Sequence, residues 1–277
     1  MAFSVNTNNG AFLALQNLNK TSGALETTQS RINTGQKVAS SKDNAAVFAI
    51  AQQLRSDVAG LNSVKGSLDN ALSTVDVAIA AGEAVSDLLV ELKEKAVSAK
   101  DSSLTSASRS SLNDDFTQLR DQISSIVSNA EFNGINAVKN NGDDISALTD
   151  DKGTSANKIT IDAQDLSLGN SNVKVGESDT IKTATSAGSA VTKIESSIKN
   201  VNTALSKLGS GAKRLELQQE FTGKLSDAIE VGIGNLVDAD LAKESANLQA
   251  LQVKQQLGLQ ALSIANQAPS TVLGLFR

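Results

Sequence analysis

A heptad repeat of apolar residues between residues 61 and 99 constrains the fold of this chain more than any other feature. Two series of positions, each spaced by seven residues, are apolar throughout except at Gly82. The first series is Leu61, Leu68, Val75, Gly82, Leu89 and Ala96, and the second is Val64, Ala71, Ala78, Val85, Leu92 and Ala99. A repeat of this length predicts a coiled-coil-like helix. We expect it to begin near residue 40, with Asp43 or Asn44 as the cap, and to span roughly 90 Å at 1.5 Å per residue.

A second long helix with the same repeat is predicted toward the carboxyl end. Its two apolar series are Val191, Ile198, Leu205 and Ala212, and Ile194, Val201, Leu208 and Leu215. Near residues 219 to 222 the pattern shifts, Phe221 and Leu225 are expected to continue the apolar face, and the repeat resumes at Ile229. Such a shift is typical of a stutter and not of a helix end.

Between these helices the pattern changes. A shorter helix follows the polar segment 101–111, and it should end before the Asn133-Gly134 turn; its apolar positions are Leu112, Phe116, Leu119, Ile123 and Ile126. Residues 140–190 are rich in Gly, Asn, Asp, Ser and Thr, with short alternations at 158–162 and 173–175. The sequence therefore predicts a mainly α fold, an elongated antiparallel helical bundle or coiled coil, with a small β-hairpin segment in the middle.

Weaker apolar stripes mark both ends of the chain. The amino-terminal stripe consists of Val5, Phe12, Leu15, Leu18, Leu25 and Ile32, and the carboxy-terminal one of Leu241, Leu248, Leu251, Leu259 and Leu262. An apolar tail, Val272-Leu273-Gly274-Leu275-Phe276, closes the chain. Exposed apolar surface of this kind indicates a binding partner.

The composition excludes several kinds of chemistry. The chain has no His, no Cys, no Trp, no Tyr and a single proline, Pro269. It therefore lacks an imidazole for acid–base catalysis and a thiol nucleophile. The formal net charge of −5, with basic residues scattered among acidic ones, argues against nucleic-acid binding. We expect no standard secretory signal, because residues 1–16 lack a basic region and an uninterrupted apolar region. We expect no membrane span, because no stretch approaches about 20 apolar residues.

The remaining polar motifs favour structural roles. The pairs Asp143-Asp144 and Asp150-Asp151 match no standard calcium-loop spacing, so we expect solvated loops and no metal or cofactor. The Gly209-Ser-Gly211 stretch lacks phosphate-loop spacing and is expected to be a helix bend. The Lys93-Glu-Lys95 run is expected to be a solvated helix face with intrahelical ion pairs.

Both ends of the chain resemble bacterial flagellin. At the amino end the resemblance rests on Val5-Asn-Thr-Asn8, Arg31-Ile-Asn-Thr-Gly35 and Ser41-Lys-Asp-Asn-Ala-Ala46, in that order. At the carboxyl end it rests on Arg214-Leu-Glu216, Asp238-Ala-Asp240 and the run from Ala265 to Leu275. The resemblance covers about residues 1–135 and 205–277 and indicates a short form without large outer domains.

This resemblance implies a non-enzymatic filament subunit for swimming motility. It implies an inner helical coiled-coil domain from residues 1–40 and 234–277, and a rod-like domain, 41–233, which contains the β segment. Contacts between subunits would come from the terminal stripes listed above, apart from Leu241, and from Val272, Leu273 and Leu275. The rod core would contain Leu61, Leu68, Val75, Leu89, Leu92, Ile198, Leu205, Leu208 and Leu215.

The resemblance also implies partners and a location. The partners are other copies in a helical homopolymer, the flagellar export apparatus, a flagellin chaperone, and the filament cap and hook-junction proteins. The location is extracellular, after secretion. Many flagellins carry an Arg-containing stretch that innate receptors bind, and here Glu91 stands where Arg is usual and Lys95 where an apolar residue is usual. The altered region is Glu91, Lys93, Glu94 and Lys95, and we expect poor receptor activation.

Three other functions are compatible with parts of the sequence. A hook–filament junction protein shares similar termini but would not polymerise indefinitely. An enzyme would need a catalytic constellation, and the carboxylates alone do not provide one. If the chain were a coiled-coil adhesin or a secreted effector, the terminal motifs would have to be a coincidence.

Overall fold

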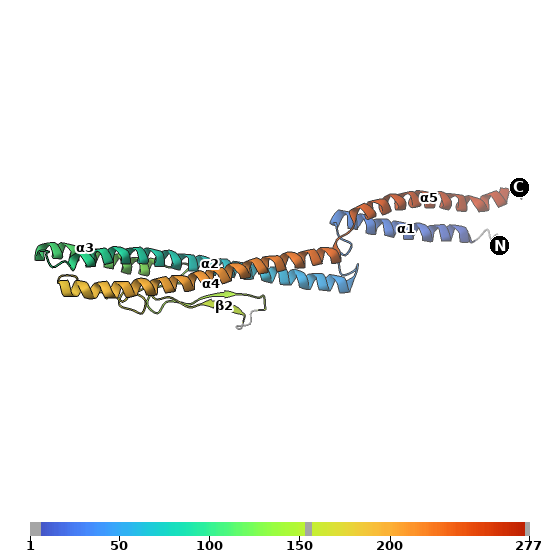
Figure 1. Cartoon of the computed structure of the whole chain (residues 1–277). Helices are drawn as coiled ribbons and strands as arrows, with labels where there is room; N and C mark the ends of the chain where they lie inside the picture. The colour runs from blue at the N-terminus through green and yellow to red at the C-terminus, as the bar shows by residue number, and fades with distance from the viewer. Residues whose placement is uncertain (1–6, 153–156, 275–277) are drawn as a thin grey trace. The chain divides into compact units, whose positions relative to one another are not determined.

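The computed structural model describes residues 7–152 and 157–274 and is mainly α-helical (Figure 1). The elements in chain order are α1 (Asn9–Thr34), α2 (Ala45–Ala99), α3 (Ser106–Asn129), β1 (Ile145–Leu148), β2 (Lys158–Ile161), α4 (Ala184–Val237) and α5 (Leu241–Gly274). They form two compact units, residues 1–56 with 228–277, and residues 57–227. The predicted fold class, helical with a small central hairpin, is confirmed.

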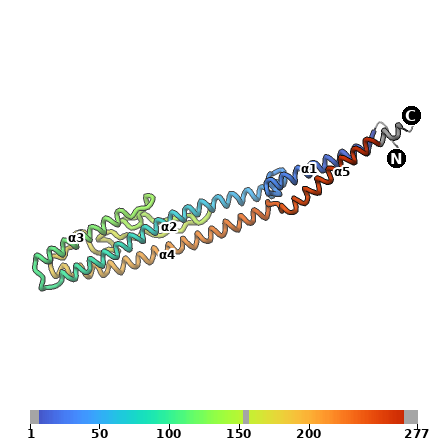
Figure 2. The backbone as a smooth tube through the Cα atoms, turned by 90° about the horizontal axis from the view of Figure 1, so that it is seen from above, coloured from blue at the N-terminus to red at the C-terminus, as the bar shows by residue number. Residues whose placement is uncertain are grey.

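In the 57–227 unit, α2 and α4 run antiparallel and side by side (Figures 1 and 2). The Lys93–Glu195 ion pair and the Asp69–Gln219 hydrogen bond fix their register at two levels. All twelve predicted heptad positions of α2 and four of the eight in α4 are buried, and the other four in α4 are half-buried. Of the predicted rod core, Leu61, Leu68, Val75, Leu89, Leu92, Leu208 and Leu215 are buried, and Ile198 and Leu205 are half-buried against the same core.

The start of α2 differs from the prediction. The helix begins at Ala45, because residues 40–44 form a turn in which the Asp43 carboxylate accepts hydrogen bonds from the Ser40 and Ala39 amides, at 2.9 and 3.1 Å. These hydrogen bonds, with that from Ser40 strongest, lower the pKa of Asp43. Asn44 is the cap, since its Oδ1 accepts from the Val47 amide at 3.1 Å.

The residues expected to continue the apolar face of α4 after the shift are wrong. Phe221 is 58% exposed and Leu225 also lies at the surface, whereas Thr222 is 1% exposed and Ser226 is buried. Buried positions 211 and 215 are followed by 222 and 226 and then by 233 and 237, each pair eleven residues after the last, so the shift occurs with polar residues in the buried positions. The Thr222 hydroxyl donates to the Gln218 carbonyl oxygen at 2.8 Å. This hydrogen bond gives the buried hydroxyl a partner within its own helix.

Two glycines allow close packing around α4. A Cβ on Gly82 would lie 2.7 Å from Leu205 Cδ2, so this break in the apolar series makes room for a leucine from the facing helix. A Cβ on Gly211 would lie 2.6 to 3.1 Å from three side-chain atoms of Ile161 in β2. Gly211 therefore leaves room for the hairpin to pack on α4. The helix α4 continues without interruption through residues 209–211, where the sequence predicts a bend.

The hairpin pairs β1 with β2 antiparallel, with Ile145 opposite Ile161. The Leu148 amide donates to Ser67 Oγ of α2 at 3.1 Å, and this contact together with Ile161 on α4 holds the hairpin against both helices. The second predicted strand, 173–175, is wrong: Val173 and Val175 are buried, but Val173 makes only an isolated bridge to Leu168.

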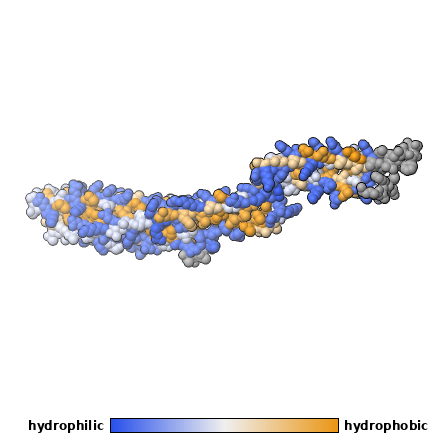
Figure 3. Space-filling view, turned by 45° about the vertical axis from the view of Figure 1, so that its right-hand side comes forward, coloured by the Kyte–Doolittle hydropathy of each residue, from blue (hydrophilic) through white to orange (hydrophobic). Residues whose placement is uncertain are grey.

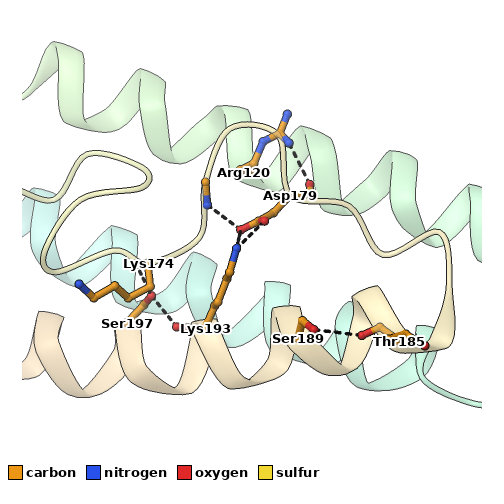
Figure 4. Close-up of polar contacts among 8 residues, drawn as sticks. Arg120, Lys174, Asp179, Thr185, Ser189, Lys193 and Ser197 are labelled. Atoms are coloured by element: carbon orange, nitrogen blue, oxygen red, sulfur yellow. Dashed lines mark hydrogen bonds and ion pairs between the residues drawn. The ribbon is translucent and has the colours of Figure 1, made fainter.

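A polar cluster around Asp179 holds the loop before α4 in place (Figure 4). Arg120 of α3 is buried, and its Nη1 donates to the Asp179 carbonyl oxygen at 3.1 Å. Lys193 Nζ of α4 pairs with the Asp179 carboxylate at 2.7 Å. Ser197 Oγ accepts from the Lys174 amide at 2.8 Å. These contacts substitute for strand pairing in this segment.

The two neighbouring glycines of α4 provide a matched test. Gly209→Ala should stabilise the chain by about 0.5–1 kcal/mol, because nothing lies within 4 Å of its Cβ position and alanine favours the helix. Gly211→Ala should destabilise it by about 1–2 kcal/mol, because overpacking against Ile161 exceeds that gain. Urea unfolding followed by circular dichroism measures both. Equal effects would contradict the packing role of Gly211.

Candidate assembly surfaces

In the unit formed by residues 1–56 and 228–277, α1 and α5 lie side by side and antiparallel (Figure 2). Asn8 caps α1 through its Oδ1, and its Nδ2 donates to the Ala265 carbonyl oxygen at 2.6 Å. Further along the pair, Leu18 contacts Gly258, where a Cβ would lie 3.3 Å from Leu18 Cδ1.

This helix pair buries little apolar surface. Among the described side chains of α1 and α5, only Thr28 and Glu244 are buried, and neither is apolar. Phe12 is 66% and Ile264 is 70% exposed, and apolar side chains are visible on its surface in Figure 3. The other exposed large apolar residues of the pair are Leu13, Leu15, Leu241, Val253, Leu257 and Leu259.

The predicted association residues divide into three groups. Phe12, Leu15 and Leu259 are exposed. Those that are half-buried are Leu18, Leu25, Ile32, Leu248, Leu251 and Leu262. Val5 and Leu275 lie outside the described residues, and of Val272 and Leu273 only the helical backbone is described.

Apolar residues lie on opposite sides of α5. At about 100° per residue, Leu251, Gly258 and Leu262 share the side that packs on α1. Val253, Leu257 and Ile264 lie on the opposite side and are exposed. A helix that is apolar on several sides is normally buried on several sides. The outer side of α5 is therefore a candidate assembly surface.

An ion pair lies where α1 and α5 approach the turn before α2. Arg31 Nη1 donates to Glu244 Oε1 at 3.2 Å, and Glu244 is 8% exposed. Backbone hydrogen bonds from Lys37 to Val237 (2.7 Å) and from Ala239 to Gly35 (2.8 Å) cross-link the two connections. Sequence reasoning missed this pair because neither residue belongs to an apolar stripe.

A polar hollow of about 570 Å³ lies beside this ion pair. Asp43, Asp240 and Lys243 contribute to its lining, and Arg31 Nε is buried there without a hydrogen-bond partner among the described residues.

Gly35 has φ of 71°, a left-handed conformation that ends α1 and turns the chain toward α2.

The lysines of the altered receptor region pair with other helices. Lys93 Nζ lies 2.9 Å from Glu195 of α4, and Lys95 Nζ lies 2.9 Å from Asp115 of α3. The hydrogen bond from Lys95 to Asp115 raises the pKa of Lys95, and that from Lys93 lowers the pKa of Glu195. The expected intrahelical pairs are therefore wrong, because both lysines reach across to neighbouring helices. Glu91 and Glu94 are exposed.

An apolar stripe lies on the outer side of α4. Leu217, Phe221 and Leu225 are spaced by four residues and are all exposed. Lys213 pairs with Glu216 at 2.9 Å and Lys224 with Glu220 at 2.7 Å beside it. Two of these residues, Phe221 and Leu225, are expected from the sequence to lie on the buried apolar face of the helix.

The carboxylate pairs act as hydrogen-bond acceptors in loops. Asp144 Oδ1 accepts from the Ala163 amide at 2.8 Å, Asp143 pairs with Lys139 at 3.5 Å, and Asp150 accepts from the Lys152 amide at 3.2 Å. Within residues 7–152 and 157–274, no three His, Cys, Asp or Glu residues gather as a metal site. In the same ranges no helix is both long and apolar enough to cross a membrane.

Two family models match this chain. The bacterial flagellin N-terminal helical region matches residues 5–143, and the bacterial flagellin C-terminal helical region matches residues 191–276. The segment between the two matches contains β1, β2 and the loop held by Asp179. The matched regions therefore include all or nearly all of each helix.

Full-length relatives extend this match. Flagellin FljK of Caulobacter vibrioides is 46% identical over 274 residues, which cover 99% of this chain and 98% of that protein. A flagellin of Brucella melitensis is 34% identical over 281 residues, with 99% of both chains covered.

A solved structure shares the fold alone. A structure described as a flagellar hook-associated protein from Vibrio parahaemolyticus has a TM-score of 0.58 and 14% identity, covering 71% of this chain and all of that chain. At this identity it does not favour the hook-junction alternative over the full-length flagellin matches. The chain belongs to the bacterial flagellin family, and it is a structural subunit that polymerises into the flagellar filament and not an enzyme.

Proposed function

We propose that residues 1–40 and 234–277 form the inner domain of the filament and that residues 41–233 form the surrounding rod-like domain. The observation that supports this division most is the difference in burial between the two regions. No described apolar side chain of α1 or α5 is buried in the single chain, whereas the α2–α4 seam has a continuous apolar core. The terminal helices are therefore the part that most needs neighbouring copies.

In this proposal the terminal apolar residues are contacts between subunits. Phe12, Leu15 and Leu259 would be covered by neighbouring copies, as would the tail residues Val272, Leu273 and Leu275. The same role is proposed for Val5 and for the half-buried stripe residues Leu18, Leu25, Ile32, Leu248, Leu251 and Leu262, which would pack in the completed inner domain. The burial of about 25 cal/mol per Å² of apolar surface would drive this association.

The terminal helices would become ordered on docking. A pair of helices without a third layer gains little burial to offset the conformational entropy of ordering, which is about 1–2 kcal/mol per residue for the backbone. Segments of this kind fold when they bind. Docking through different patches on each copy produces a heterologous contact that does not close, so the assembly grows as a helix.

We also propose that the chain is secreted and acts outside the cell. The flagellar export apparatus would carry it in an unfolded state, and a flagellin chaperone would cover the carboxy-terminal helix before export. The exposed apolar residues of α5 support this need for cover. The filament cap and the hook-junction proteins would be its partners at the two ends of the filament.

Assembly is tested by Leu257→Asp, with Gln256→Asp as the matched control. Both positions are exposed in the single chain, so neither change should alter the fold of the monomer. Leu257 lies on the outer apolar side of α5, where a buried charge is costly, and we expect at least about a tenfold rise in the monomer concentration needed for seeded elongation. Electron microscopy of seeded filaments measures this.

Normal filaments from Leu257→Asp would contradict the inner-domain assignment. Failure of the unchanged chain to elongate seeds would instead favour a junction role. Gln256→Asp carries the same charge at an adjacent position, so its normal elongation shows that the effect depends on the apolar side of α5.

The altered receptor region would make this flagellin a poor activator of innate receptors. Glu91 and Glu94 expose negative charge, and Lys93 and Lys95 are engaged with α4 and α3. A receptor surface that accepts an Arg at the Glu91 position would meet a charge of the wrong sign.

Purified monomer should therefore signal weakly in a receptor reporter assay, and Glu91→Arg should increase the signal by about tenfold or more. Glu83→Arg is the control, since it makes the same change of charge on the same helix, outside the altered region. Strong signalling by the unchanged monomer would refute the proposal.

A further inference from the structure

An acidic surface runs along α2. Seven exposed residues share one side of this helix at about 100° per residue: Asp76, Glu83, Asp87, Val90, Glu91, Glu94 and Val97. Among the described residues none of these five carboxylates forms an ion pair, and the stripe has no cation of its own. We call this stripe the acidic face; it combines two exposed valines with a strong negative field.

A surface of opposite character lies on α4. Its apolar centre is Leu217, Phe221 and Leu225, all exposed. Lys207 and Arg214 lie along its edge, are exposed, and form no ion pair within the described parts of the chain. A hollow of about 290 Å³ between α4 and β2 is lined by these two cations, by Ile161 and by a single carboxylate, Asp162. We call this surface the basic face.

The two faces do not neutralise each other within one chain. The Asp69–Gln219 hydrogen bond places the centre of the basic face level with residue 69 of α2. The same register places the cations Arg214 and Lys207 level with residues 74 and 81, so Glu91 and Glu94 lie ten or more residues further along α2, about 15 Å or more at 1.5 Å per residue. This separation exceeds the Debye length of about 8 Å at physiological ionic strength.

We propose that the acidic face of one copy docks on the basic face of a second copy in the filament. This inference rests on the filament function and adds the pair of surfaces that meet. Each face has an exposed apolar centre, and their unpaired charges are of opposite sign, which is the complementarity that orients protein interfaces. Val90 and Val97 would pack against Leu217 and Phe221, while Glu91 and Glu94 approach Lys207 and Arg214.

The position of the faces also suits continuous growth. Because the two faces are different patches, each new copy docks with one face and keeps the other free, so the assembly always ends in one free acidic face and one free basic face. Their separation along the helices would stagger neighbouring copies, so that the contact repeats without closing. A symmetric pair would instead require the same patch on both copies.

Charge reversal tests this pairing. Glu91→Lys with Glu94→Lys, or Lys207→Glu with Arg214→Glu, should each raise the monomer concentration needed for elongation by about tenfold or more, because like charges then meet. The variant carrying all four changes restores opposite charges, and its elongation should return to within about threefold of the unchanged chain.

Asp114→Lys with Glu131→Lys is the control, since it changes the net charge equally at exposed positions outside both faces. Circular dichroism of each monomer checks that the fold is retained. If the double variants elongate like this control, or if the fourfold variant is worse than either double variant, the pairing is wrong. If the unchanged chain fails to elongate, the filament function and this interface are both overturned.

Discussion

One seam between two helices cannot cover apolar residues that point to other sides of those helices. In the 57–227 unit, α3, the hairpin and the loop held by Asp179 add further layers, and a continuous core results. The α1–α5 pair has no such layers, and its described apolar side chains stay at least partly exposed. This unequal burial within one chain is the constraint from which the assembly function follows.

Periodicity predicted most of the helical architecture. The heptad series located α2 and α4, because regular spacing alone determines which positions face a partner helix. The prediction failed where burial depended on position and not on residue type. Thr222 and Ser226 occupy buried positions of α4 although they are polar, and Phe221 is exposed although it is aromatic.

Other features could not be read from one helix at a time. Gly82 interrupts the apolar series because Leu205 fills its space, and Gly211 is small because Ile161 packs on it. The sequence alone suggests that Lys93 and Lys95 pair with residues of their own helix. The packing of α4 and α3 against α2 instead brings Glu195 and Asp115 beside them. Each of these depends on a third element whose position single-sequence patterns do not specify.

Hydrogen exchange on monomer and filament tests the central claim most directly. If the α1–α5 pair depends on neighbouring copies, its amides should exchange quickly in the monomer and become strongly protected in the filament. The amides of the α2–α4 seam in the 57–227 unit should be protected in both states. Equal protection of α1 and α5 in monomer and filament would contradict the account.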